Sequence, residues 1–123
     1  MNTKANVKNE IKRLSYKIVY VSHKVVKNHI ACYNVRYKGK LIRPPVAIKL
    51  RIPLNEIWIS KKFQKYEKFI LFHELKEIKY REKGYDRKTA HKMAREDDLL
   101  AWKNNPKWKK LNTEVIRIMK SEP

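Results

Sequence analysis

Alternating apolar and polar positions indicate a β-sheet in the first half of the chain. Residues 16–21 are rich in β-branched and aromatic side chains, and apolar residues occupy every second position in 31–38 and in 46–52. The short run 56–60 has a similar character. A period of two is typical of strands that bury one face. We therefore predict four strands at these positions, arranged as an antiparallel sheet with one polar face.

Glycine and proline separate the predicted strands. Gly39 marks the turn between the second and the third. Pro44 and Pro45 force a bend or an edge position where the third strand begins, because proline has no backbone N–H to donate. Pro53 ends that strand. The third predicted strand is therefore the one least free to pair on both sides.

From about residue 61 the apolar spacing changes to that of helices. Gly84 is expected to end the first long helix, Asp86 to cap the second, and Asn105 with Pro106 to begin the third. The predicted helices are 5–14, 61–83, 86–103 and 106–119. Strands first and helices after indicate an α+β fold, with a sheet of about four strands followed by two or three helices. We expect residues 1–123 to form a single domain.

The composition places this domain in a reducing, aqueous compartment. The chain has 123 residues, of which 42% are hydrophobic, and one cysteine, Cys32. A lone cysteine excludes an internal disulfide and suits the cytoplasm. The N-terminal residues have no apolar core of a secretory signal, and the run 69–72 is too short to cross a membrane. We therefore expect a cytoplasmic protein without a membrane partner.

The net charge of +19 is distributed unevenly. Residues 1–66 carry 16 Lys and Arg against two acids, a net charge of +14, whereas residues 67–98 carry nine against eight. The basic half is either an electrostatic footprint for nucleic acid or a solvated Lys-rich surface. Lys outnumbers Arg by 23 to 8, which favours non-specific contact over base reading. This Lys-rich, cysteine-poor composition resembles that of proteins from archaea and their viruses or plasmids.

The acidic residues gather around two histidines. His73 and Glu77 are four residues apart on the first long helix and therefore share one face of it. A short turn near Gly84 would fold the next helix back as an antiparallel partner and bring His91 to the same place. Two His and one Glu are the ligand set of many catalytic zinc sites, which leave a fourth position for water. Zinc, or another divalent metal, is the cofactor that this pattern predicts.

Two more carboxylates complete the candidate site. Glu74 adjoins the first ligand and is positioned to act as general base. Asp98 follows His91 by two helical turns, where it is expected to accept the second ring proton of His91 or to serve as a further ligand. Two hypotheses remain open for this cluster. In one it binds a metal; in the other His73 and Glu77 form an ordinary hydrogen-bonded pair and the acids balance lysines.

The run from His73 to Glu77, with His91 downstream, resembles the zincin metallopeptidases, in particular their short or degenerate members. The family motif is H-E-x-x-H on a helix, with a third ligand downstream. The resemblance implies that His73 is a ligand, Glu74 the base, and strand 56–60 an edge that binds extended peptide. Glu77 stands where the family has its second His.

The leading functional hypothesis is therefore a small zincin-like metal-dependent hydrolase that acts on a peptide or protein, or a degenerate relative of one. The alternative is a basic nucleic-acid-binding protein without catalysis, which would contact DNA or RNA non-specifically through residues 1–66.

Overall fold

The computed structural model describes residues 7–121 and has the predicted α+β composition. Its sheet has four strands in the order β1-β4-β2-β3. β4 pairs in parallel with β1, whereas β2 is antiparallel to both β4 and β3. The sheet is thus mixed, and the prediction of a purely antiparallel sheet was wrong. The strands are β1 (Lys17–Val21), β2 (Ala31–Tyr37), β3 (Lys40–Ile42) and β4 (Glu56–Ser60).

The connection between β1 and β2 explains this topology. Instead of a tight hairpin it contains helix α2 (His23–Val26) and the 3₁₀ turn η1 (Lys27–His29). Ser22 caps α2 by accepting a hydrogen bond from the Lys24 backbone N–H at 3.4 Å. The longer connection carries β2 one position further across the sheet, and β4 later takes the place between β1 and β2.

The predicted strand 46–52 is also wrong, because residues 45–49 form helix α3 (Pro45–Lys49). Pro45 occupies the first helical turn, where its missing N–H costs nothing. The strand prediction would have placed Ile48 on the buried face, yet Ile48 is 57% exposed and Ala47 is fully buried. The third strand is instead β3, which follows the turn at Gly39 as far as Ile42.

The helical half agrees with the sequence prediction. Residues 61–66 form the 3₁₀ turn η2 (Lys61–Tyr66), which leads into helix α4 (Glu67–Glu82). Residues 5 and 6 of the predicted first helix lie outside the described part of the chain. Gly84 follows α4 with a φ of +105°, and Asp86 accepts a hydrogen bond from the Thr89 N–H at 2.8 Å. The helices are α1 (Val7–Arg13), α4 (Glu67–Glu82), α5 (Arg87–Trp102) and α6 (Pro106–Ser121).

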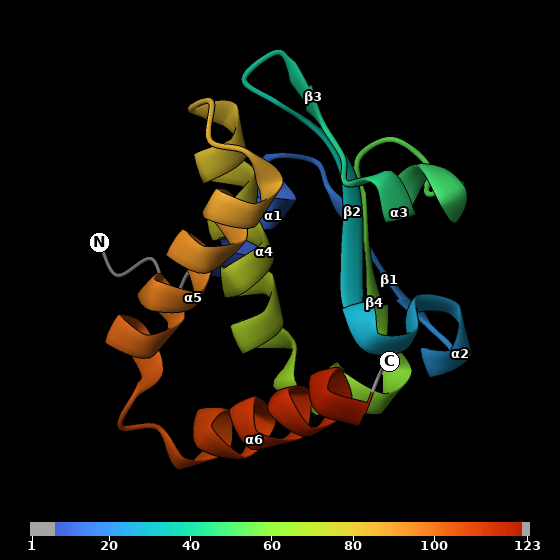
Figure 1. Ribbon diagram of the computed structural model, residues 1–123. Helices are drawn as coiled ribbons and strands as arrows, with labels where there is room; N and C mark the ends of the chain where they lie inside the picture. Colours follow the sequence, from blue (N-terminus) through green and yellow to red (C-terminus); the bar gives the residue numbers. More distant parts are fainter. Residues whose placement is uncertain (1–6, 122–123) are drawn as a thin grey trace.

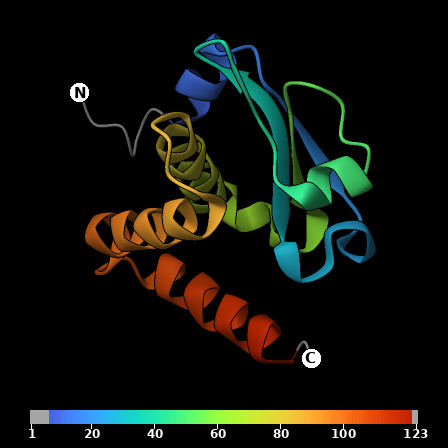
Figure 2. The ribbon, with the colours of Figure 1, turned by 45° about the horizontal axis from the view of Figure 1, so that its top comes forward.

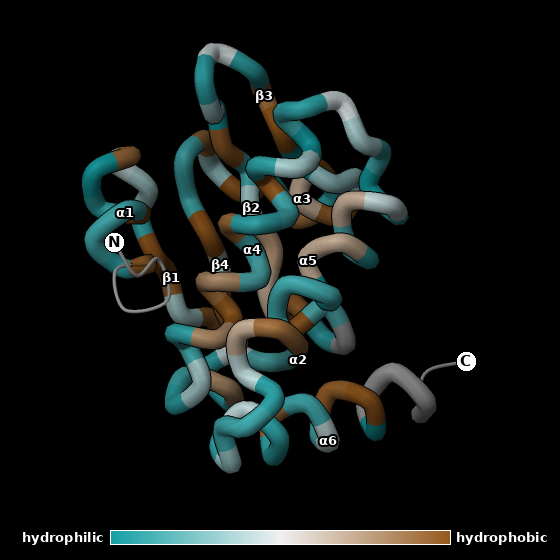
Figure 3. Tube along the Cα trace, turned by 90° about the vertical axis from the view of Figure 1, so that its left-hand side faces the viewer, coloured by the Kyte–Doolittle hydropathy of each residue, from teal (hydrophilic) through white to brown (hydrophobic). Residues whose placement is uncertain are grey.

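Helix α4 lies at the centre of the molecule, between the sheet and α5 (Figure 1). Buried residues occur on both sides of α4, and hydrophobic segments gather along α4, β2 and β4 (Figure 3). The methyl side chains of Ala90 and Ala94 are fully buried and permit close packing of α5 on α4. Helix α6 runs from the end of α5 across one end of this assembly and packs against η1 and η2 (Figure 2). No helix of residues 7–121 combines the length and the apolarity that a membrane span requires.

Candidate metal centre

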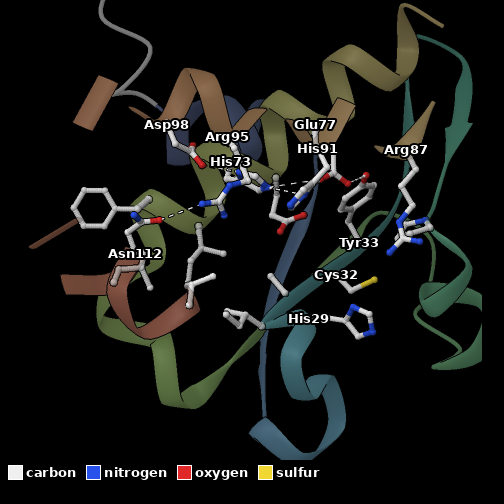
Figure 4. A pocket seen from close by; sticks show the side chains of 18 of the residues that line it. His29, Cys32, Tyr33, His73, Glu77, Arg87, His91, Arg95, Asp98 and Asn112 are labelled. Carbon is white, nitrogen blue, oxygen red and sulfur yellow. Dashed lines mark hydrogen bonds and ion pairs between the residues drawn. The ribbon is translucent and has the colours of Figure 1, made fainter. Parts of the chain in front are cut away.

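A groove of about 630 Å³ is lined by residues of α4, α5, α6 and β2 (Figure 4). Its floor carries polar and ionisable side chains from α4 and α5, and its α6 end is apolar. All five sequence-predicted site residues line it. They are His73, Glu74, Glu77, His91 and Asp98.

Three of these residues bring one potential ligand atom each to a common point (Figure 4). His73 Nε2 lies 3.3 Å from His91 Nδ1 and 3.6 Å from Glu77 Oε2, and His91 Nδ1 lies 3.1 Å from the same carboxylate oxygen. The His73 and Glu77 side chains are 16% and 8% exposed, whereas that of His91 is 45% exposed. The group is therefore sheltered on the α4 side and open to the groove on the α5 side.

These separations fit a metal ion. Zinc binds His nitrogen and carboxylate oxygen at about 2.0–2.1 Å, so two ligand atoms of a tetrahedral site are about 3.3–3.4 Å apart. The three separations found here bracket that value. The His73–Glu77–His91 group can thus hold a metal ion with little side-chain movement.

Asp98 fixes the orientation of His73 rather than that of His91. Its Oδ2 lies 2.7 Å from His73 Nδ1, and the three-atom group does not include it. A carboxylate on one ring nitrogen directs the other nitrogen toward a metal and keeps it basic, which is the usual outer-sphere arrangement of a metal-binding His. The expected contact between Asp98 and His91 is absent among the described hydrogen bonds, because the helix crossing brings Asp98 alongside His73.

Tyr33 is a member of the site that the sequence analysis missed. Its hydroxyl donates a 2.6 Å hydrogen bond to Glu77 Oε1, and the residue is almost fully buried. The two oxygens of the Glu77 carboxylate therefore have different partners. Oε1 accepts the Tyr33 hydrogen bond, and Oε2 faces the two histidines. Strand alternation placed Tyr33 on one face of β2, but only the packing of that face on α4 reveals its partner.

Charge interactions within the cluster shift two pKa values in opposite directions. Burial alone would lower the pKa of His73, but the hydrogen bond to Asp98 and the nearby Glu77 carboxylate raise it to about 10. Burial would raise the pKa of Glu77, yet His73, His91 and Tyr33 together lower it. The metal-free cluster therefore carries a positive charge on His73 between the carboxylates of Asp98 and Glu77. A bound cation would supply positive charge to these carboxylates in place of the His73 proton.

Glu74 lines the groove next to His73 and is 8% exposed. No hydrogen bond or ion pair joins its carboxyl to another residue of the described chain. Burial and the nearby Glu77 raise the pKa of Glu74 to about 8, against the effect of His73. The side chain thus faces the groove instead of neutralising a surface lysine.

The strand that borders the groove is β2, which corrects the expectation for residues 56–60. β4 lies between β1 and β2 and is no edge strand. Backbone carbonyls of Ile30 and Asn34 accept hydrogen bonds on the β4 side, so strand alternation turns the polar groups of Ala31 and Tyr33 outward. β3 pairs with residues 35–37, and Pro44 lines the groove beyond it. Residues 31–33 are thus the part of the β2 edge that has no strand partner among the described strands, and they line the groove as buried residues.

Other groove residues had no role in the sequence analysis. Arg87 and Arg95 line it from α5, one turn before and one turn after His91. Cys32 is buried in an apolar cluster with Ala47 and Ile52, and burial raises the pKa of its thiol to about 12. A neutral buried thiol is a poor metal ligand and nucleophile.

Comparisons of the chain with models of protein families, with curated proteins and with solved structures found no match. The candidate site therefore rests on its own geometry, and the resemblance to zincins stays a prediction.

Proposed function

We propose that this protein is a small zinc-dependent hydrolase with a zincin-like site, and that its substrate is an extended peptide. The observation that carries the proposal is the convergence of His73 Nε2, His91 Nδ1 and Glu77 Oε2 in a groove that Glu74 also lines. Three protein ligands with an open side are typical of catalytic zinc sites, whereas structural sites are closed by four.

Each residue has a distinct part in this proposal. His73, Glu77 and His91 would hold the ion, and Asp98 would keep the His73 ring in place. A zinc ion in such a site acidifies water and polarises a carbonyl. Glu74 would accept the proton of the attacking water and later return it to the leaving amine. Backbone groups of Ala31 and Tyr33 would pair with the substrate as an added strand.

The hydrogen-bonded alternative explains fewer features. An i,i+4 pair needs only His73 and Glu77, yet their closest polar atoms are 3.6 Å apart, longer than a good hydrogen bond. That alternative also leaves out His91, whose Nδ1 lies 3.3 Å from His73 Nε2 and 3.1 Å from Glu77 Oε2. A bound cation attracts all three atoms at once.

Metal analysis of protein purified without an affinity tag tests the proposal directly. We expect one zinc per chain and a rise in melting temperature when zinc is added. Glu74→Gln should keep the metal and abolish peptide hydrolysis. Glu96→Gln is the matched control, since Glu96 is an exposed acid on α5 outside the groove. Protein that binds no zinc overturns the proposal, and zinc binding without turnover on a peptide library would identify a degenerate relative.

Nucleic-acid binding is a second candidate, supported by unpaired cations. Of the basic residues between positions 7 and 66, only Lys8 and Lys38 form salt bridges with acids of the described chain. The others leave a positive surface whose affinity for DNA or RNA should fall steeply with rising salt. Absence of a mobility shift at low salt would remove this candidate, and it leaves the zinc proposal unaffected.

A further inference from the structure

Helix α5 presents a row of three cationic or metal-binding side chains to the groove. Arg87, His91 and Arg95 are spaced by four residues and therefore share one helix face. A helix rises about 1.5 Å per residue, so each arginine begins about 6 Å along the axis from His91. Figure 4 shows the two arginines on opposite sides of the His73–His91 group. A substrate bound at that group would pass both guanidinium groups.

The two arginines differ in their partners. Arg95 Nη2 donates a long hydrogen bond of 3.4 Å to Asn112 Oδ1 on α6. Arg87 has no hydrogen bond or salt bridge with any residue of the described chain, and it extends toward His29 and Cys32 on the β2 side of the groove (Figure 4). A guanidinium presents a planar set of donors that matches a carboxylate. Arg87 is thus available to bind an anionic group that enters the groove.

The end of the groove at α6 is lined mainly by hydrocarbon. Ile70 of α4 and Leu111 and Val115 of α6 line it with hydrocarbon. The groove therefore changes from a largely apolar end at α6, where Asn112 accepts a hydrogen bond from Arg95, to the unpaired guanidinium of Arg87, with the metal-binding group between. The edge of β2 at residues 31–33, which has no strand partner among the described strands, lines the same space. An occupant that matches all three features is a peptide with an apolar side chain on one side and an acidic one on the other.

We propose that Arg87 makes this groove selective for extended peptides that carry Asp or Glu within one or two residues of the bond held at the His73–Glu77–His91 group. The inference rests on the proposed function, because that group sets which bond is addressed. A single-stranded nucleic acid is the less suitable occupant, since its phosphates would have to pass the hydrocarbon of Leu111 and Val115 at the other end.

Peptide binding separates this inference from catalysis. Three fluorescein-labelled hexapeptides, identical except for Glu, Gln or Lys at one position beside a central Leu, would be titrated by fluorescence anisotropy with zinc and, separately, with EDTA. We expect the Glu peptide to bind about tenfold more tightly than the Gln peptide, the magnitude of one charge-assisted pair. Arg87→Glu should reverse the order, so that the Lys peptide binds most tightly. An acid in the first helical turn favours α5, so this variant should fold.

Arg13→Glu is the control for overall charge. Arg13 is exposed at the end of α1, outside the groove, and its replacement changes the net charge by the same amount. We expect it to keep the preference for the Glu peptide. An unchanged preference in Arg87→Glu, or equal losses in both variants, would overturn the inference.

Three further outcomes test the two proposals. Arg87-dependent preference without zinc binding or hydrolysis would sustain the peptide inference and overturn the hydrolase. Hydrolysis of all three peptides at equal rates would do the reverse. An oligonucleotide that binds through Arg87 while no acidic peptide does would replace the peptide as occupant and so overturn the inference.

Discussion

Tyr33 on β2 donates a 2.6 Å hydrogen bond to Glu77 on α4, and so connects the sheet to the candidate metal ligand. Both residues are buried. The phenol satisfies one carboxylate oxygen and leaves the other for the two histidines. Without that bond the Glu77 carboxylate would be free to rotate away from the groove.

Tyr33→Phe should therefore reduce both stability and metal affinity. A buried carboxylate oxygen left without its donor costs about 1–3 kcal/mol, and loss of a partner outside the ligand sphere weakens metal binding about 10–100-fold. Urea denaturation and a zinc competition titration measure the two effects. Tyr16→Phe is the matched control, because the Tyr16 hydroxyl donates to the Arg36 carbonyl at 2.8 Å, away from the groove. Equal zinc affinities in the two variants would contradict the role of Tyr33.

Asp98→Asn should weaken zinc binding about tenfold or more, because an amide is a poorer acceptor for the His73 Nδ1–H than a carboxylate. Competition with a chromogenic chelator measures the change. Asp97→Asn alters the neighbouring residue, whose carboxylate accepts from the Tyr80 hydroxyl instead. We expect that variant to bind zinc as the natural chain does. If both substitutions were silent, Asp98 would have no part in metal binding.

Substitutions of Glu77 test the unusual ligand. Glu77→Gln removes the anionic ligand and should lower zinc affinity by a larger factor than Asp98→Asn. Glu77→His would restore the more common ligand set, and we expect it to preserve or strengthen zinc binding. Cobalt substitution followed by visible absorption spectroscopy reports the geometry in each case. A Glu77→Gln protein that binds zinc with unchanged affinity would exclude Glu77 as a ligand.

A pH dependence of stability is expected from Glu67, which does not line the groove. Burial would raise the pKa of Glu67, but Lys8 and the Tyr20 hydroxyl lower it below its ordinary value of 4.5. The ionised carboxylate therefore stabilises the fold above about pH 4.5, and this contribution is lost as the pH falls through the lower folded-state pKa.

Glu67→Gln should accordingly cost about 0.5–1 kcal/mol at pH 7 and progressively less toward pH 3, by urea denaturation at several pH values. Glu96→Gln serves as reference, since Glu96 is exposed and forms no salt bridge within the described residues. A difference between the natural chain and Glu67→Gln that did not shrink at low pH would argue against the ionised Glu67 as its source.

Local signals in the sequence predicted the helical half well. Asp86 caps α5 through its own side chain. Gly84 adopts a positive φ just after the end of α4. Asn105 accepts hydrogen bonds from the backbone of Lys107 and Trp108 and begins α6. These interactions span at most three residues, so the residue types alone are sufficient to locate them.

The sheet was predicted less well, because strand order depends on partners far apart in the chain. The alternation in 46–52 suits a strand and a short helix equally, and Pro45 at the first helical position decided for the helix. Likewise, nothing within residues 17–21 or 56–60 specifies that these two strands pair in parallel. That pairing follows from the longer connection through α2 and η1.

The candidate site divides in the same way. The sequence by itself determined that His73 and Glu77 share a helix face and that His91 can reach them, because helical periodicity and a short turn set those positions. Only the tertiary structure decided that Asp98 contacts His73, that Tyr33 holds Glu77, and that β2 borders the groove. Each of these depends on how α4 packs against a different element. Such packing is the sum of many weak contacts between distant segments, and no short stretch of sequence encodes it.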